Sequence, residues 1–200
     1  MTSGDEVLIQ ADMEGASGQV YTFHPRTFNG TVDAVANLPD VSPYYYPMVV
    51  AVLNAAARKV GWIDRSVECS SAEQGQCARY ICEFIKEKHG ICRIGMIGFH
   101  RALLEEAVAV FGVENLAVMD LNPHNIGSFI YGVEVWDGDK DHSPLINFAD
   151  VLLIAGTNLV NGKADKILQQ SGDKPYYLFG TTAAGLAKVN DLPWLCPMSI

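Results

Sequence analysis

The sequence is poor in basic residues. Its 200 residues include 14 lysines and arginines against 23 aspartates and glutamates, which gives a formal net charge of −9 at pH 7. No cluster of Lys and Arg offsets this balance. Because binding to a phosphate backbone depends on clustered cationic side chains, we do not expect a nucleic acid partner.

A long uninterrupted hydrophobic run is also missing. The most apolar stretch, YYYPMVVAVLNAAARKVG at 44–61, is interrupted by Pro47 and Asn54 and is too short to cross a bilayer. The opening MTSGDEVLIQADMEG has neither the basic start nor the apolar centre of a secretory signal. We therefore expect a cytoplasmic protein without a membrane partner.

Known cysteine motifs and catalytic motifs are absent. None of the five cysteines belongs to a C-x-x-C pair, which argues against a zinc knuckle and a thioredoxin-like redox motif. Their odd number and irregular spacing also argue against a disulfide framework, and cytoplasmic thiols stay reduced. H-E-x-x-H, Walker A and G-x-S-x-G motifs do not occur either, so no named hydrolase or kinase chemistry is indicated.

One cysteine has a position that favours reactivity. Cys69 lies in a polar loop two residues before Ser71, the expected N-cap of a helix, where a thiol can have a lowered pKa. Cys77 and Cys82 lie on the apolar side of the same helix, and we expect them in the core.

The front of the chain is irregular. Strands are expected at 6–10 and 20–24, with a turn between them and a loop at 29–43. A buried helix should then run from about Pro47 to Val60. Its Asn54 needs hydrogen-bond partners, either in a neighbouring loop or in a site. The exposed-looking run Tyr44–Tyr46 would suit a homodimer contact or would pack on the front strands.

The remainder alternates strands and helices. An amphipathic helix is expected over 70–90, with Ser71 as its cap and Gly90 at its end. Apolar strands and helices then alternate to the end of the chain, among them helices at 101–111 and 161–170 and a single short strand at 130–136. This pattern is typical of a parallel sheet covered on both faces. We predict an α/β fold with a small α+β part at 1–65 and a Rossmann-like domain with a mostly parallel sheet at 66–200. The strand order cannot be read from the sequence.

Four turns should meet at one edge of this sheet. Ligands of open parallel sheets bind outside the carboxyl ends of the strands, where the sequence has GFHRA, DLNPHNIG, GTNLVNG and GTTAAG. Thr and Asn are also ordinary N-caps, and Gly suits tight turns, but their recurrence at one edge favours a crevice for an anionic or oxygen-rich ligand. The candidate ligand-binding residues are Gly98, Phe99, His100, Asp120, Asn122, Asn125, Thr157, Asn158, Asn161, Gly180, Thr181 and Thr182.

His100 takes the place of a glycine. A dinucleotide loop G-x-G-x-x-G that starts at Gly98 would need glycine at 100 and 103, and this chain has His100 and Leu103. Asp120 lies where a ribose-binding carboxylate would belong, but the missing glycines argue against NAD. The imidazole either faces a ligand or only meets backbone and solvent at the helix start. His24 and His142 are isolated in loops and read as surface residues.

The second half resembles a known family. The segments IGMIGFHRALLEEAVAVFG, VMDLNPHNIG, ADVLLIAGTNLVNGKADKIL and YYLFGTTAAG, with VVAVLNAAARKVGWIDRSVEC upstream, are similar to the "Putative heavy-metal chelation" family over roughly residues 45–200. The resemblance implies a Rossmann-like domain packed on a module like the N-terminal domain of enolase, here shortened, with a site in the cleft between them. It also implies a role in metal handling or anaerobic corrinoid synthesis.

Two functions of different classes follow. The first is a protein that binds a transition metal ion, or a small anionic molecule or metal chelate, with His100, Asp120 and Cys69 as metal donors. The alternative is an enzyme with a nucleotide-type cofactor or substrate, in which His100 acts as acid or base and Asp120 holds a ribose. A non-catalytic scaffold with an incidental crevice would bind neither kind of ligand.

Overall fold

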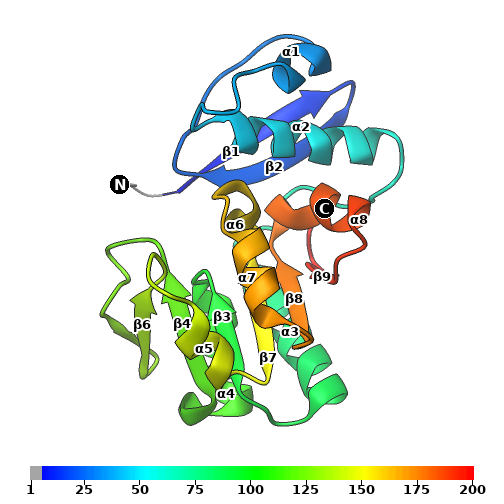
Figure 1. The fold of residues 1–200 in the computed structure, drawn as a ribbon. Helices are drawn as coiled ribbons and strands as arrows, with labels where there is room; N and C mark the ends of the chain where they lie inside the picture. Colours follow the sequence, from blue (N-terminus) through cyan, green and yellow to red (C-terminus); the bar gives the residue numbers. More distant parts are fainter. Residues whose placement is uncertain (1–5) are drawn as a thin grey trace.

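The computed structural model describes residues 6–200 and has a small upper unit above a larger α/β unit (Figure 1). In the upper unit a two-stranded antiparallel sheet of β1 (Val7–Met13) and β2 (Ala16–Thr22) packs on α2 (Tyr45–Lys59). The short helix α1 (Val32–Ala36) packs against α2. The predicted boundary at residue 65 stays a prediction.

The larger unit is built on a seven-stranded sheet with the order β5-β6-β4-β3-β7-β8-β9. All pairs are parallel except β5 with β6. Without β5, and with the other six strands renumbered along the chain, the sheet has the strand order 3-2-1-4-5-6 of Rossmann folds. The strands are β3 (Ile94–Ile97), β4 (Leu116–Asp120), β5 (Phe129–Ile130), β6 (Val133–Asp137), β7 (Val151–Ala155), β8 (Tyr176–Phe179) and β9 (Trp194–Leu195).

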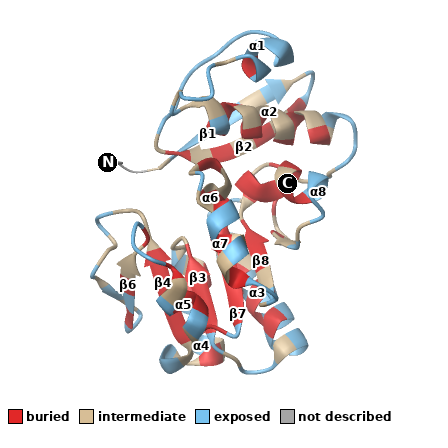
Figure 2. Ribbon diagram, viewed as in Figure 1, coloured by how far each residue is buried: buried red, intermediate tan, exposed pale blue. Residues whose placement is uncertain are grey.

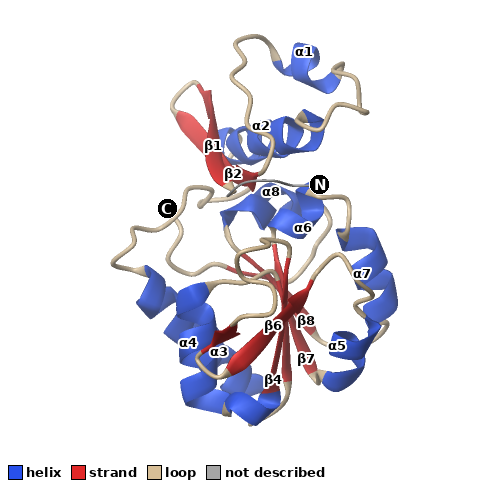
Figure 3. Ribbon diagram, turned by 90° about the vertical axis from the view of Figure 1, so that its left-hand side faces the viewer, coloured by secondary structure: helices blue, strands red, loops and turns tan. Residues whose placement is uncertain are grey.

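Helices cover both faces of this sheet (Figure 3). One core cluster joins the sheet to α3 (Gln74–His89) and α4 (Arg101–Phe111), and a second joins its other face to α5 (Ser143–Phe148), α7 (Ala164–Ser171) and α8 (Ala184–Val189). The central strands are buried along their whole length (Figure 2). Short helices follow two strands: α6 (Thr157–Val160) comes after β7 and η2 (Thr181–Ala183) after β8. A third, η1 (Val113–Asn115), connects α4 to β4. The predicted α/β fold is thus confirmed.

The front differs from the sequence prediction in two places. The first turn is only Glu14–Gly15, both with positive φ (47° and 87°), so β2 starts at Ala16 rather than at residue 20. The expected loop contains α1, whose N-terminus is capped by Thr31: its hydroxyl accepts a hydrogen bond from Ala34 N at 3.2 Å.

Local hydrogen bonds explain further differences in the back half. Ser71 does not cap α3, because the Glu73 carboxylate folds back onto Ser70 N at 2.9 Å and the helix begins at Gln74. The single strand expected at 130–136 is the β5–β6 hairpin, with Tyr131 and Gly132 at positive φ in its turn.

Two helix predictions were also incomplete. The helix expected at 161–170 is divided into α6 and α7, with Gly162 at φ 69° between them. The helix α5 was not predicted at all. His142, expected on the surface, lies at the start of α5 and is only 4% exposed, whereas His24 is exposed as predicted.

Asn54 joins the two units. Its side chain is fully buried in α2 and donates to Gln19 O at 3.1 Å and to Thr181 O at 3.2 Å, while its Oδ1 accepts from Gly185 N at 2.7 Å. Asn54 was expected to form its hydrogen bonds either in a neighbouring loop or in a site. The structure shows the first: its side chain braces a neighbouring loop. This brace holds η2, which follows β8, against the upper unit.

Two remaining expectations concern the whole chain. Within residues 6–200, the helices are too short or too polar to span a lipid bilayer. Tyr46 at the start of α2 is half exposed, and the Arg26 guanidinium lies 4.2 Å from the Tyr44 ring centroid. A homodimer stays a prediction.

Candidate functional site

A cavity of about 370 Å³ lies at the carboxyl ends of β3, β4, β7 and β8, under the upper unit. The predicted residues Gly98, Phe99, His100, Asp120, Thr157, Asn158, Gly180, Thr181, Thr182 and Cys69 all line it. The four strand ends therefore converge on one space, although they are far apart in the sequence.

Glycines allow the strand ends to approach each other. Gly98 has φ +96°, and a Cβ there would lie 2.4 Å from the Ala155 Cβ at the end of β7. A Cβ on Gly156 would lie 2.6 Å from Ala183 N in η2. These turns contain glycine because neighbouring turns occupy the space of a side chain, whatever the ligand.

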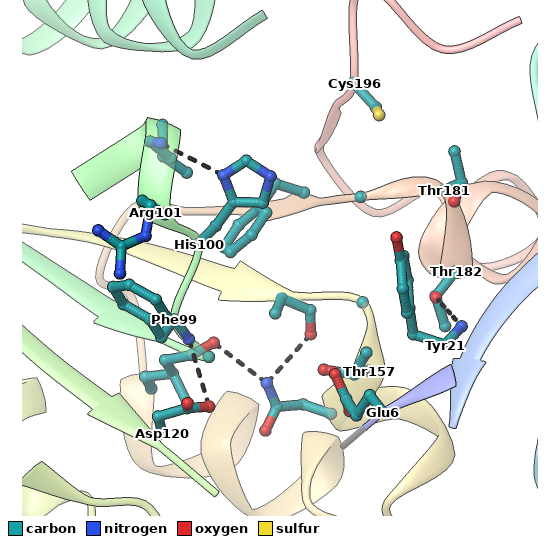
Figure 4. A pocket seen from close by; sticks show the side chains of 18 of the residues that line it. Glu6, Tyr21, Phe99, His100, Arg101, Asp120, Thr157, Thr181, Thr182 and Cys196 are labelled. Atoms are coloured by element: carbon teal, nitrogen blue, oxygen red, sulfur yellow. Dashed lines mark hydrogen bonds between the residues drawn. The ribbon is translucent and has the colours of Figure 1, made fainter. Parts of the chain in front are cut away.

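His100 caps α4 and presents its other nitrogen to the cavity (Figure 4). Its Nδ1 accepts a hydrogen bond from Leu103 N at 3.2 Å. Burial lowers the pKa of the imidazole, and the nearby Glu68 only partly opposes this. The ring is therefore neutral at pH 7, and because Nδ1 is an acceptor, Nε2 carries the proton.

This tautomer does not suit metal binding through Nε2. A metal ion at Nε2 would require the proton of a neutral imidazole to sit on Nδ1, facing the Leu103 N–H. The side chain also covers the helix N-terminus at which a dinucleotide would place its pyrophosphate. His100 is thus arranged as a hydrogen-bond donor to whatever fills the cavity.

Asp120 is held by its own neighbours. One carboxylate oxygen accepts from Asn125 Nδ2 at 2.6 Å, and the other lies 3.5 Å from Phe99 N (Figure 4). Asn125 does not line the cavity and instead orients Asp120. Burial raises the pKa of Glu6 to about 7, and the negative charge of Asp120 contributes to this shift as the smaller effect. Two carboxyl groups from different units therefore share one end of the cavity.

Of three further predicted asparagines, two lie outside the cavity lining, and the third borders the cavity but serves the fold. Asn122 and Asn161 lie outside its lining, and Asn122 Oδ1 accepts from His124 N at 3.0 Å. Asn158 borders the cavity, but its Nδ2 donates to Ile97 O and Ala155 O, both at 3.1 Å, which ties β3 to β7.

The threonines differ in their hydrogen bonds. Thr182 Oγ1 accepts from Tyr21 N at 3.1 Å and links η2 to β2. Thr181 is 3% exposed, and its Oγ1 has no hydrogen-bond partner among residues 6–200. Such a buried orphan hydroxyl is costly unless a ligand or water satisfies it.

Sequence reasoning missed several lining residues. Glu6, Tyr21 and Glu68 come from the front and the connection to α3, and the Tyr21 hydroxyl donates to Glu68. His142 also borders the cavity, and neither of its ring nitrogens has a partner within the described chain. No local pattern marks these positions, because their placement depends on how the two units pack.

The Cys69 thiol does not have the lowered pKa that we expected. Burial, followed by the nearby Cys77, Glu68 and Glu73, raises its pKa to about 11. The helix cap that was to stabilise a thiolate is absent, since α3 begins later than predicted.

The proposed metal donors do not form a ligand set. In the part of the chain that the structure describes, no group of three or more His, Cys, Asp or Glu side chains is arranged to hold a metal ion. His100, Asp120 and Cys69 line the same cavity without forming such a group.

Comparison with known proteins gives a family and a fold. No curated protein matches the chain. A DUF364 protein of unknown function from Desulfitobacterium hafniense DCB-2 is 13% identical with a TM-score of 0.61, over 94% of this chain and 77% of that one. One from Pyrococcus horikoshii is 18% identical with a TM-score of 0.57, over 89% of this chain and 68% of that one. These structures share the fold, and they are themselves of unknown function.

The sequence profile of one family matches residues 82–191, which is more than half of the chain. The matched region begins within α3 and ends just before β9, so it includes the ends of β3, β4, β7 and β8 that line the cavity. Its description suggests metal handling but specifies no metal, ligand or reaction. The chain belongs to the DUF364 family, "Putative heavy-metal chelation".

Proposed function

We propose that the protein binds a small metal chelate, rather than a bare metal ion, in the cavity at the strand ends. One observation carries the proposal: the cavity measures about 370 Å³, yet no three-donor group lies in residues 6–200. Small-molecule sites have volumes of about 300–1,000 Å³, whereas a bare zinc-like ion needs about four close donors. A chelator that brings most of the donors itself satisfies both requirements.

The charges of the lining favour a neutral or cationic chelate. Glu6, Glu68 and Asp120 line the cavity, and Arg101 is the cationic side chain that accompanies them. An anionic chelate, the expectation from the sequence, would be repelled by the carboxylates of Glu68 and Asp120, which act over short distances in a partly buried site. Glu6 adds to this repulsion above pH 7, where it is ionised.

Two neutral groups would recognise the chelator. His100 Nε2–H is a donor on one side of the cavity, and the Thr181 hydroxyl is unpartnered on the other (Figure 4). Together they suit the oxygen and nitrogen atoms of an amino-acid chelator.

Titration calorimetry with the bis-histidine complex of Ni²⁺, which is neutral, tests the proposal. We expect binding of one complex per chain, with much weaker binding of nickel citrate, histidine or Ni²⁺ alone. Thr181→Val should weaken binding about three- to tenfold, the value of a lost neutral hydrogen bond. Its own stability should not fall, because the hydroxyl has no protein partner.

Two results would count against the proposal. Equal binding of Ni²⁺ with and without histidine would mean that the protein supplies a full ligand set. Binding of NAD or a nucleotide, with no response to any nickel species, would favour the nucleotide enzyme instead.

A further inference from the structure

His142 is a buried histidine whose ring forms no hydrogen bond within the described chain. It lies at the start of α5, is 4% exposed, and borders the cavity together with Gly138 and Asp120. Neither Nδ1 nor Nε2 has a partner among residues 6–200. An unpaired polar group in the interior lowers stability, so its presence beside a cavity points to a ligand that pairs with it.

The loop that carries His142 is held in place by other hydrogen bonds. Gly138 N donates to Asp120 O at 2.7 Å, and a Cβ on Gly138 would lie 2.8 Å from the same oxygen. Lys163 Nζ donates to Gly138 O at 2.9 Å. On the helix side, Ile146 N donates to His142 O at 2.9 Å. The backbone of the loop is thus fixed beside the end of β4, while the imidazole that it carries stays unpaired.

The His142 imidazole is neutral at pH 7. Burial, followed by the positive charges of Lys163 and Lys166, lowers its pKa below the usual 6.5. The carboxylates of Asp141 and Asp139 only partly oppose this shift. A neutral imidazole has one N–H donor and one acceptor nitrogen. It therefore suits a ligand group that donates or accepts a hydrogen bond, rather than a group that needs a cation.

The unpartnered Thr181 hydroxyl lies on the other side of the same cavity. Thr181 follows β8 and His142 follows β6, and the strands β4, β3 and β7 lie between these two in the sheet. His100 follows β3, near the middle of this row. Both unpaired side chains border one space of about 370 Å³. A single ligand that pairs with both must extend across the cavity and carry a polar group at each end.

We propose that His142 binds one end of the chelate while Thr181 binds the other, so that the ligand is an elongated complex with two polar arms. The inference rests on the proposed function and specifies its ligand class: a metal ion held between two amino-acid molecules. In such a complex each arm has a carboxylate oxygen, which can accept from an imidazole N–H. A histidine arm also has a ring N–H, which can donate to an imidazole nitrogen.

Calorimetry with the nickel–histidine complex and urea unfolding of the ligand-free protein together test this subsite. His142→Phe keeps a flat ring and removes both nitrogens, whereas His142→Gln keeps one donor and one acceptor. His24→Phe is the matched control, because His24 is exposed and does not line the cavity. A double variant joins His142→Phe with Thr181→Val.

We expect His142→Phe to bind the complex about tenfold more weakly than the parent, the effect of a lost hydrogen bond to a buried group. Its urea midpoint should be equal or higher, because two unpaired polar atoms leave the interior. His142→Gln should recover part of the affinity, and His24→Phe should match the parent. The double variant should lose about thirty- to hundredfold, the product of the single effects, because separate contacts act independently.

Failure of this inference is distinguishable from failure of the chelate proposal. Unchanged affinity in His142→Phe would overturn the subsite and leave the chelate proposal in place, and a double variant no weaker than the weaker single variant would overturn the two-ended ligand. A lower urea midpoint in His142→Phe would mean that the ring serves the fold. If the parent does not bind the complex, the proposed function and the two-armed ligand both fail.

Discussion

At the scale of single residues, His100 has two separable roles. Its Nδ1 satisfies Leu103 N at the start of α4, and its Nε2–H faces the cavity. Asparagine can perform the first role but does not reach as far as an imidazole. His100→Ala should therefore lose about 1 kcal/mol of stability together with ligand binding, whereas His100→Asn should recover the stability alone.

Urea unfolding and calorimetry with the nickel–histidine complex measure the two roles. If His100→Asn restored binding as well as stability, the imidazole would be a helix cap and nothing more.

Glu6 should make stability depend on pH in an unusual direction. Its pKa is raised from 4.5 to about 7 in the folded protein, mainly by burial. Between these two values the folded state keeps a proton that the unfolded state releases, so this contribution is complete below pH 4.5 and is lost as the pH rises through 7. Glu6→Gln should therefore be more stable than the parent at pH 8 and similar to it near pH 4.5.

Unfolding free energies of the two proteins between pH 4.5 and 8 give the comparison. Their difference isolates Glu6 from other titrating groups, and a difference that stays constant over this range would contradict the burial of Glu6 beside Asp120.

At the scale of elements, the contact of β2 with α2 depends on Gly18. A Cβ at this position would lie 2.3 Å from Ala55 N and 2.4 Å from Ala51 O, both backbone atoms that cannot move aside. Gly18→Ala should therefore cost about 2 kcal/mol or more. Gly75→Ala is the control: it is exposed in the first turn of α3, its Cβ meets nothing within 4 Å, and it should gain up to about 1 kcal/mol.

Thermal or urea unfolding of both variants measures this contrast. Equal stabilities would mean that the hairpin does not pack on α2 as described.

The elements that the sequence predicts well are those determined by local signals. The helix expected at 101–111 ends at Gly112 as observed, because an apolar periodicity and a C-terminal glycine specify it. The six-residue helix α5 and the split between α6 and α7 escape such reasoning, since each is too short to show a period.

The site was predictable to a similar degree. Convergence of the strand ends follows from a parallel sheet, so His100, Thr181 and Asp120 could be placed together. Glu6 and Tyr21 could not, because they reach the cavity only through the packing of the upper unit.

At the scale of the whole molecule, the cavity belongs to neither unit alone. The α/β unit supplies the strand ends, and the upper unit closes them with Glu6 and Tyr21. Asn54 fixes this arrangement through buried hydrogen bonds to Thr181 O and Gly185 N. A ligand bound here would contact both units and should stabilise the molecule as a whole.

The location of a bound chelate is the most direct test of this account. Anomalous X-ray scattering at the nickel edge, from crystals grown with the nickel–histidine complex, would give the metal position without assumptions about the ligand. We predict a single strong peak inside the cavity, between His100, Asp120 and Thr181. An empty cavity, with nickel only on surface carboxylates or histidines, would contradict the account.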